Sequence, residues 1–311
     1  MTEPETPTRC GFCAILGAPN AGKSTLLNRL VGTKVAIVTH KVQTTRTRIR
    51  GVALHGAAQI VFVDTPGIFA PRRRLDRAMV DAAWSGADDA DAVVVLIDVA
   101  RLAAKDGGGK SREDTERIIE GLKASRRGAV LALNKIDEVR RDTLLPLAQE
   151  WSEAGPFTDT FMISGLTGDG IDALLDHTAA AMPEGPWLYP EDQAADMTER
   201  LLAAEVTREK LILRLHDELP YDTTVETERW RRLKDGSVRI EQTIYVARDT
   251  QKAIVLGKQG RTVREIGSLA RADLEEMLEA RIHLFLFVKV REKWLDEPAR
   301  YREMGLDFPK G

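Results

Sequence analysis

The stretch "GAPNAGKST", from Gly17 to Thr25, decides the fold of the first half of this chain. It fits the pattern G-x-x-x-x-G-K-[ST], in which backbone N–H groups surround a phosphate chain. The apolar run "FCAIL" precedes it and "STLLNRLVG" follows it, which predicts a buried strand, a loop and a helix. Because a helix N-terminus attracts anions, this order predicts a phosphate-binding loop. The alternative is a chance match in a turn.

The composition is that of an ordinary globular protein. The 311 residues include 43% hydrophobic and 30% charged residues, and the net charge of −3 gives no overall attraction to nucleic acid or membrane. The length suits two domains. No apolar run reaches the ~18 residues of a membrane span, and the N-terminal residues do not resemble a targeting peptide. We therefore expect a cytoplasmic protein.

The two cysteines, Cys10 and Cys13, form a C-x-x-C pattern. A redox pair is expected where a strand ends and a helix begins, and a zinc site would need two further ligands. This pair instead leads into the strand before the phosphate loop. We expect both residues to lie in the core or at a strand edge.

Further motifs follow in a fixed order, each at the end of an apolar run. "AQIVFVDTPG" contains Asp64, whose carboxylate can hold Mg²⁺, and Gly67, whose N–H can reach a γ-phosphate. "DAVVVLIDVA", "GAVLALNKID" and "FMISGLTGDGIDALL" add three strand patterns that alternate with helical stretches. The order predicts an α/β fold, with a doubly wound and mostly parallel sheet and a site at the carboxyl ends of its strands.

The stretch "NKID" indicates which base is bound. The carboxylate of Asp137 can accept hydrogen bonds from N1–H and the exocyclic amine of guanine, whereas adenine has no such pair of donors. Alone, the stretch could be an amphipathic loop. After the phosphate loop and "DTPG", it predicts GTP as the ligand.

These motifs resemble those of the translation-factor-like GTPases, which contain G-x-x-x-x-G-K-S, D-x-x-G and N-K-x-D. In that family a threonine completes the Mg²⁺ shell, and of Thr44 and Thr45 the T-R pattern selects Thr45. The family's last motif is S-A-K or S-A-L, and the corresponding residues of this chain are Ser164, Gly165 and Leu166. The expected metal ligands are Ser24, Thr45 and Asp64. The expected GTP-binding residues are Gly17, Asn20, Ala21, Gly22, Lys23, Ser24, Thr25, Asp64, Gly67, Asn134, Lys135, Asp137, Ser164 and Gly165.

One position departs from many GTPases. They carry a glutamine just after D-x-x-G that orients the attacking water, and here that residue is Ile68. Related GTPases with a hydrophobic residue there often have a phosphate-loop asparagine that helps to hold potassium, and Asn20 occupies that place. We expect slow hydrolysis that potassium stimulates. The expected catalytic residues are Lys23, Asn20, Thr45 and Gly67.

The second half has a different pattern. Prolines at 183, 186 and 190 predict a linker. Beyond it, "TERLLAAEVTREKLILRL" has helical periodicity, strand patterns flank the turn "KDGS", and "IHLFLFVKV" is a last strand pattern. We expect a GTPase domain over 8–182, a linker over 183–197 and a second domain over 198–311.

The stretch "GKQG" fits the G-x-x-G loop of KH domains, which clamps single-stranded RNA. Residues 248–271 hold six basic and two acidic side chains, a local charge of 6 − 2 = +4 that suits a phosphate backbone. A bare turn is the alternative. The order of helix, hairpin, two helices and strand favours an α+β type II KH domain. The expected RNA-binding residues are Gly257, Lys258, Gln259, Gly260, Arg261 and Arg264.

A GTPase domain joined to a C-terminal KH domain resembles the Era family of bacterial ribosome-assembly GTPases over nearly the whole chain. The resemblance implies a GTP-controlled switch that binds the 3′ region of 16S ribosomal RNA and assists 30S subunit maturation. It implies no DNA partner, and a possible peripheral place at the inner membrane. Two alternatives stay open: a GTPase acting on a membrane or cell-cycle partner, and an RNA-binding protein with a degenerate GTPase domain. The intact Lys23, Asp64 and Asp137 argue against the second.

Overall fold

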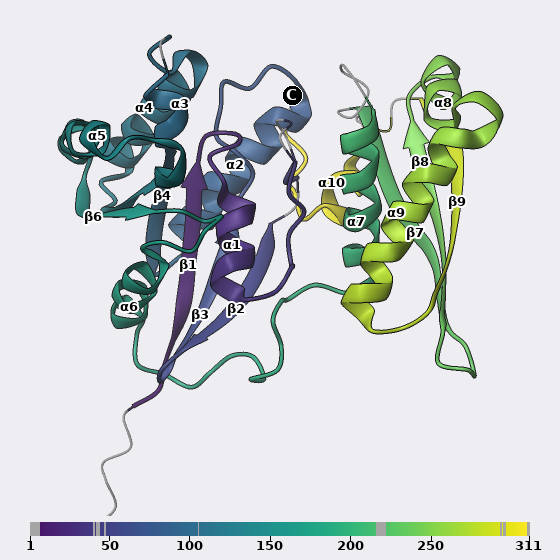
Figure 1. Ribbon diagram of the computed structural model, residues 1–311, viewed down its shortest axis with the longest axis horizontal. Coiled ribbons are helices and arrows are strands. Elements are labelled where there is room, and N and C mark those ends of the chain that lie inside the picture. The colour runs from purple at the N-terminus through teal and green to yellow at the C-terminus, as the bar shows by residue number, and fades with distance from the viewer. Residues whose placement is uncertain are drawn as a thin grey trace, which may run out of the picture. The chain divides into compact units, whose positions relative to one another are not determined.

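The structure is a computed structural model (Figure 1). It describes residues 7–39, 41, 44–46, 48–104, 106–215, 222–292, 294 and 297–309. The chain divides into two compact units. Unit 1 comprises residues 1–36, 45–196 and 304–311, and unit 2 comprises residues 37–44 and 197–303. The short segment 37–44 therefore belongs to unit 2, although the residues on both sides of it belong to unit 1.

Unit 1 is built on a six-stranded sheet with the strand order β2-β3-β1-β4-β5-β6. Neighbouring strands are parallel, apart from the antiparallel pair β2 and β3. This arrangement confirms the predicted doubly wound, mostly parallel sheet. The strands are β1 (Arg9–Gly17), β2 (Ile49–His55), β3 (Ala58–Asp64), β4 (Ala92–Asp98), β5 (Ala129–Asn134) and β6 (Phe157–Ile163).

Helices cover both faces of this sheet. Adjacent residues such as Ile15 and Leu16 point to opposite faces of β1, and neither is exposed. One core cluster joins the sheet to α2, α4 and α5 through residues such as Ala83, Ile118 and Trp151. The helices are α1 (Lys23–Val31), α2 (Arg74–Asp88), α3 (Val99–Leu102), α4 (Gly109–Ser125), α5 (Arg141–Ala154) and α6 (Ile171–Ala181), with the 3-10 turn η1 (Ile136–Glu138).

Both cysteines are buried on strand β1 with free thiols, which confirms the expectation of core residues. A spacing of three places Cys10 and Cys13 on opposite faces of the strand. Burial, with a smaller contribution from Asp91, raises the pKa of the Cys13 thiol to about 12. That thiol is therefore protonated and unreactive at neutral pH.

The proline-containing stretch after α6 is held along the sheet of unit 1. The N–H of Cys10 donates to the carbonyl of Pro183 at 3.0 Å, and the N–H of Val52 donates to that of Ala194 at 2.9 Å. The buried amide oxygen of Gln59 accepts from the N–H groups of Leu188 and Tyr189 at 2.8 and 3.0 Å. These bonds satisfy backbone groups that a free edge would expose.

Unit 2 contains a three-stranded sheet with the order β7-β8-β9, in which β7 and β8 are antiparallel and β8 and β9 are parallel. Apolar residues of α7 and α9 pack against one face of the sheet. The expected order of helix, hairpin, two helices and strand is confirmed. The elements are α7 (Glu199–Arg214), β7 (Thr223–Arg232), β8 (Val238–Val246), α8 (Asp249–Leu256), η3 (Lys258–Gly260), α9 (Arg261–Leu278), β9 (Ile282–Val290) and α10 (Pro298–Glu303).

Within the described part of the chain, we find no helix with the length and apolar character needed to span a membrane.

Candidate nucleotide and RNA sites

The phosphate loop joins the end of β1 to the start of α1. Gly22, which caps this helix, has a φ of 98°, and a Cβ added there would lie 2.4 Å from Nδ2 of Asn134. Only glycine fits both requirements. Asn20 is exposed and also has a positive φ, 64°. The turn therefore exposes the free N–H groups at the start of α1, where an anion can bind.

Lys23 is buried inside this loop, with 6% of its surface exposed. Its Nζ donates hydrogen bonds to the carbonyl oxygens of Gly17 at 3.1 Å and Ala18 at 3.0 Å. Burial lowers the pKa of Lys23 to about 8, against the opposing effect of the Asp64 carboxylate. A bound phosphate would give this ammonium a closer counter-charge.

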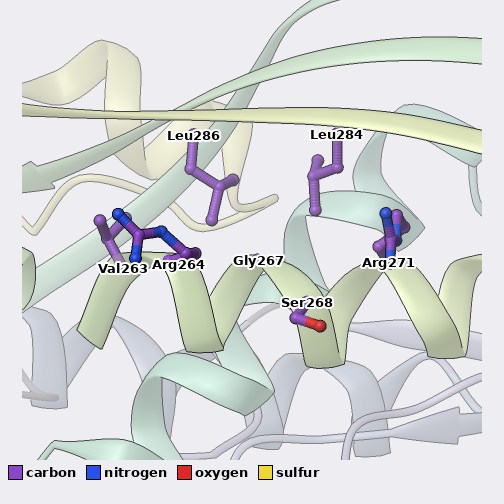
Figure 2. Close-up of a pocket in the computed structure, with 7 residues that line it drawn as sticks. All are labelled: Val263, Arg264, Gly267, Ser268, Arg271, Leu284 and Leu286. Carbon is purple, nitrogen blue, oxygen red and sulfur yellow. The ribbon is translucent and has the colours of Figure 1, made fainter. Parts of the chain in front are cut away.

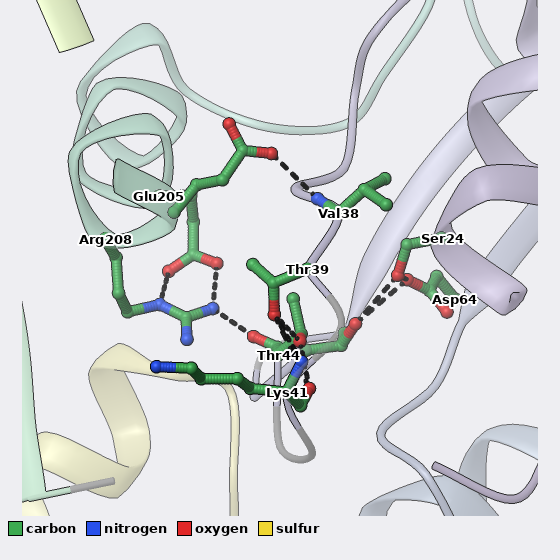
Figure 3. A network of polar contacts seen from close by, with 10 residues as sticks. Ser24, Val38, Thr39, Lys41, Thr44, Asp64, Glu205 and Arg208 are labelled. Atoms are coloured by element: carbon green, nitrogen blue, oxygen red, sulfur yellow. Dashed lines mark hydrogen bonds and ion pairs between the residues drawn. The ribbon is translucent and has the colours of Figure 1, made fainter. Parts of the chain in front are cut away.

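The three predicted metal ligands lie together, and Figure 3 labels Ser24 and Asp64. The hydroxyl of Ser24 donates to Oδ2 of Asp64 at 2.7 Å, and that of Thr45 donates to the same oxygen at 3.2 Å. The two hydroxyl oxygens are 3.0 Å apart. Asp64 is fully buried, and its Oδ1 has no hydrogen-bond partner among the described residues. Burial raises the pKa of Asp64, while Lys23 and the two hydroxyls oppose that shift. Clustered oxygens with one unsatisfied carboxylate atom fit a hard cation such as Mg²⁺.

The loop after β3 contacts the phosphate loop closely. A Cβ on Gly67 would lie 3.0 Å from the backbone N and Cα of Pro19, and the N–H of Ile68 donates to the carbonyl of Gly17 at 3.2 Å. The side chain of Ile68 is fully buried in the core of unit 1. It therefore cannot orient a water molecule, in agreement with its apolar character.

Asn134 has a structural role in addition to the GTP-binding role that its motif predicts. Its Nδ2 donates to the carbonyl of Ala21 at 2.8 Å, and its Oδ1 accepts from the N–H of Gly165 at 2.9 Å. The amide thus ties the phosphate loop to the loop of Ser164 and Gly165, which is also buried. This positioning role follows from contacts distant in sequence, which the motif alone does not indicate.

The two charged residues of "NKID" are oriented differently. Lys135 has a φ of 69°, and its Nζ lies 2.5 Å from Oδ2 of Asp98, a partner that the sequence analysis did not identify. Asp137 is exposed on the 3-10 turn η1, where its carboxylate can accept hydrogen bonds from a base. Thr25, also expected at the site, is half-buried on α1.

Within unit 2, the segment before Thr45 is held on α7 by buried ions (Figure 3). Glu209, 3% exposed, accepts from the N–H of Val38 at 2.9 Å. Arg208, 2% exposed, donates through Nε to Glu205 at 2.7 Å and through a terminal nitrogen to the carbonyl of Thr44. Sequence reasoning missed these residues, because their helix looks like an ordinary amphipathic one.

The predicted RNA-binding loop connects α8 to α9. Gly257, Gln259 and Gly260 have φ values of 70°, 53° and 74°, and a Cβ on Gly257 would lie 2.1 Å from Oγ1 of Thr262. The loop therefore requires glycine at its first position. The side chains of Lys258 and Gln259 at its tip, and those of Arg261 and Arg264 that follow, are exposed or half-buried.

A groove of about 360 Å³ lies between α9 and strand β9 (Figure 2). Leucines from β9 point toward α9, and an arginine stands near each end of the groove (Figure 2). Apolar surface bounded by guanidinium groups suits RNA bases and their phosphates. The lining residues are Val263, Arg264, Gly267, Ser268, Arg271, Leu284 and Leu286, of which only Arg264 was among the expected RNA-binding residues.

Comparison with known proteins identifies both units. A family model described as a 50S ribosome-binding GTPase matches residues 12–135, and a KH domain model matches residues 218–295. GTPase Era of Rhizobium meliloti is 62% identical over 304 residues, which cover 98% of this chain and 95% of that protein. GTPase Era of Caulobacter vibrioides is 57% identical over 314 residues, with 99% of each chain covered.

Two solved structures are similar over 96% of this chain and 99% of theirs, each with a TM-score of 0.87 and 36% identity. One is a single-residue variant of Aquifex aeolicus Era bound to GDP and AlF4⁻. The other is Era in complex with MgGDPNP and nucleotides 1506–1542 of 16S ribosomal RNA. The phosphate loop, the guanine motif and the G-x-x-G loop thus occur in a chain that matches these proteins almost from end to end, and the chain belongs to the Era family of GTPases.

Proposed function

We propose that this chain binds and hydrolyses GTP, and that it binds the 3′ region of 16S ribosomal RNA through its KH domain to assist 30S subunit maturation. The observation that carries the proposal is the cluster of Ser24, Thr45 and Asp64 beside the buried Lys23. An RNA-binding protein with a degenerate GTPase domain would have no need to retain it. The RNA assignment is supported by the Era complex with nucleotides 1506–1542.

In this proposal different residues of unit 1 bind the metal ion, the phosphates and the base of GTP. Ser24, Thr45 and Asp64 would hold Mg²⁺. When bound, the ion would supply positive charge beside the phosphate oxygens. Lys23 and the N–H groups of the phosphate loop hold the phosphates, while the carboxylate of Asp137 selects guanine. Asn134 positions the two loops that surround the nucleotide.

We further propose that potassium takes part in hydrolysis. Ile68 occupies the position where many GTPases have the glutamine that orients the attacking water. Its side chain is apolar and buried, so it cannot take that role. Asn20, exposed on the phosphate loop, can supply an oxygen to a potassium ion beside the phosphates. Hydrolysis is then slow until RNA or another partner completes the site. The chain acts in the cytoplasm, with the inner membrane as a possible peripheral location.

The proposed domain organisation keeps a GTPase domain over 8–182, a linker over 183–197 and a KH domain over 198–311. In the KH domain, the G-x-x-G loop clamps the RNA backbone and the groove between α9 and β9 receives bases. Ser268 and Arg271 join the expected RNA-binding residues because they line this groove.

The pKa of Lys23 predicts that GTP binding takes up a proton above pH 8. The free protein holds this residue with a pKa of about 8, and bound phosphate raises that pKa. The complex therefore binds more protons than the free protein, and GTP affinity falls as the pH rises through 8. Calorimetry at pH 7.0 and 8.5, in buffers of different ionisation enthalpy, measures the uptake. Lys23→Arg, which cannot titrate there, is the control. An uptake that does not increase with pH would contradict the prediction.

Hydrolysis of GTP is expected to be faster in potassium than in sodium, and Asn20→Ala should abolish that difference. Removing one group that stabilises transition-state charge costs about 2.7–4 kcal/mol, so the effect should not exceed roughly 10²–10³-fold. Steady-state phosphate release in the two chlorides, at equal ionic strength, is the measurement. Equal rates for the parent protein would refute the potassium proposal.

Replacing Lys258 and Gln259 with aspartates tests the RNA-binding function. Both glycines of the loop remain, and the charge of residues 248–271 falls from +4 to 4 − 3 = +1. Affinity for 16S RNA spanning nucleotides 1506–1542 should fall sharply, with a smaller salt dependence, because phosphate contacts are lost. GTP binding and basal hydrolysis should stay near the parent's. Filter binding at two salt concentrations and GTP turnover are the measurements.

The matched control is Arg141→Asp with Leu145→Asp, which also changes the charge by −3. Both positions are exposed on helix α5 of unit 1. This control should leave RNA affinity unchanged. Retained RNA affinity in the loop variant would overturn the proposed KH function.

A further inference from the structure

Strand β9 lies at an edge of the unit 2 sheet and presents different side chains to its two faces. Leu284 and Leu286 line the groove beside α9. Phe285 and Phe287 alternate with them and therefore point to the opposite face, where they are 42% and 49% exposed. Two adjacent, exposed phenylalanine side chains on one face of a sheet indicate a surface that binds a ligand or partner.

Arginines from the β7–β8 hairpin share this face. Arg229 pairs with Glu241, which in turn pairs with Phe285, and Arg231 pairs with Arg239. Since paired residues of neighbouring strands point the same way, these side chains form one surface with the phenylalanines. We call it the hairpin-end patch, and it comprises Arg229, Arg231, Arg239, His283, Phe285 and Phe287.

The charges of the hairpin-end patch are poorly balanced. Like charges directly opposite one another, such as Arg231 and Arg239, destabilise a sheet. Glu241 is shared by Arg239 at 2.9 Å and Arg229 at 3.8 Å. Within the described residues Arg231 has no ion pair, so the three arginines share one carboxylate, that of Glu241. The nearby Glu228 accepts from Thr243, which pairs with Phe287, and its charge is balanced by Lys289. An anionic ligand would relieve this repulsion.

The guanidinium of Arg239 lies over the ring of Phe285, 4.6 Å from its centroid. A guanidinium over one ring, with a second exposed ring on the same face, can receive RNA bases, and the remaining arginines can bind phosphates. An acidic protein segment would satisfy the arginines but would not require two exposed rings.

We propose that the hairpin-end patch is a second RNA-contact surface, which binds single-stranded RNA that continues from the groove around the edge strand β9. The inference rests on the proposed RNA-binding function. The two surfaces are formed by alternate residues of one strand, so RNA leaving the groove over this edge reaches Phe285 and Phe287 first. A KH loop clamps about four nucleotides, which leaves longer RNA available for the patch.

The experiment compares two RNAs on the full-length protein. The long RNA spans nucleotides 1506–1542 of 16S ribosomal RNA, and the short RNA is the smallest fragment of it whose binding is abolished by Lys258→Asp combined with Gln259→Asp. Phe287→Ser should weaken binding of the long RNA about tenfold, as expected for one lost stacking contact. Arg231→Gln should weaken it and lower its salt dependence. Neither Phe287→Ser nor Arg231→Gln should change binding of the short RNA. Retained binding of the short RNA also shows that the variant is folded.

Arg140→Gln, which removes one exposed guanidinium from unit 1, is the charge-matched control and should affect neither RNA. Unchanged affinity for the long RNA in both patch variants would overturn this inference but not the proposed RNA-binding function. A protein would then be the candidate partner of the hairpin-end patch. Equal weakening of both RNAs would also overturn it, because the residues would then act on the groove. Failure of the parent protein to bind either RNA would refute the proposed function and this inference together.

Discussion

The burial of Lys23 at the start of α1 and of Asp64 at the end of β3 is the constraint on which unit 1 depends. Removing an ion from water costs several kcal/mol, so each of these groups needs partners that the fold must supply. Two loop carbonyls accept from the ammonium, and two hydroxyls donate to one carboxylate oxygen. The second carboxylate oxygen stays unsatisfied among the described residues. A site with this imbalance is suited to a ligand that brings both a cation and negative phosphates.

The loops around these ions are held by close approach rather than by bulky side chains. A Cβ on Gly22 would lie 2.4 Å from the side-chain amide of Asn134, and one on Gly67 would lie 3.0 Å from the backbone of Pro19. Asn134 then joins the phosphate loop to the loop of Gly165 through both ends of its amide. An apolar residue there would leave a carbonyl and an N–H without these partners, at a cost of about 1–3 kcal/mol for each buried group. Preorganised N–H groups are what a phosphate-binding site needs.

Much of the fold and site could be predicted because the relevant signals are local. Continuous apolar runs predicted β3 and β5, motif spacing indicated Ser24 and Asp64, and the resemblance to the translation-factor-like GTPases indicated Thr45, which the structure places beside them. Strand β2 was not predicted, since the exposed Arg50 interrupts its apolar pattern at the sheet edge. The contacts of Arg208 with Thr44 and of Asn134 with Ala21 join residues far apart in sequence. No local pattern indicates them, and the same holds for the groove residues Ser268 and Arg271.

We propose that unit 1 recognises guanine through the exposed carboxylate of Asp137 on the turn η1 and that it holds the phosphates beside Lys23 and Asp64. Nucleotide competition with Asp137→Asn tests it most directly, because an amide can donate where the carboxylate only accepts. We expect weaker GTP binding and a preference for xanthosine triphosphate, whose base has a carbonyl in place of the exocyclic amine. An unchanged preference for guanine would show that Asp137 does not select the base.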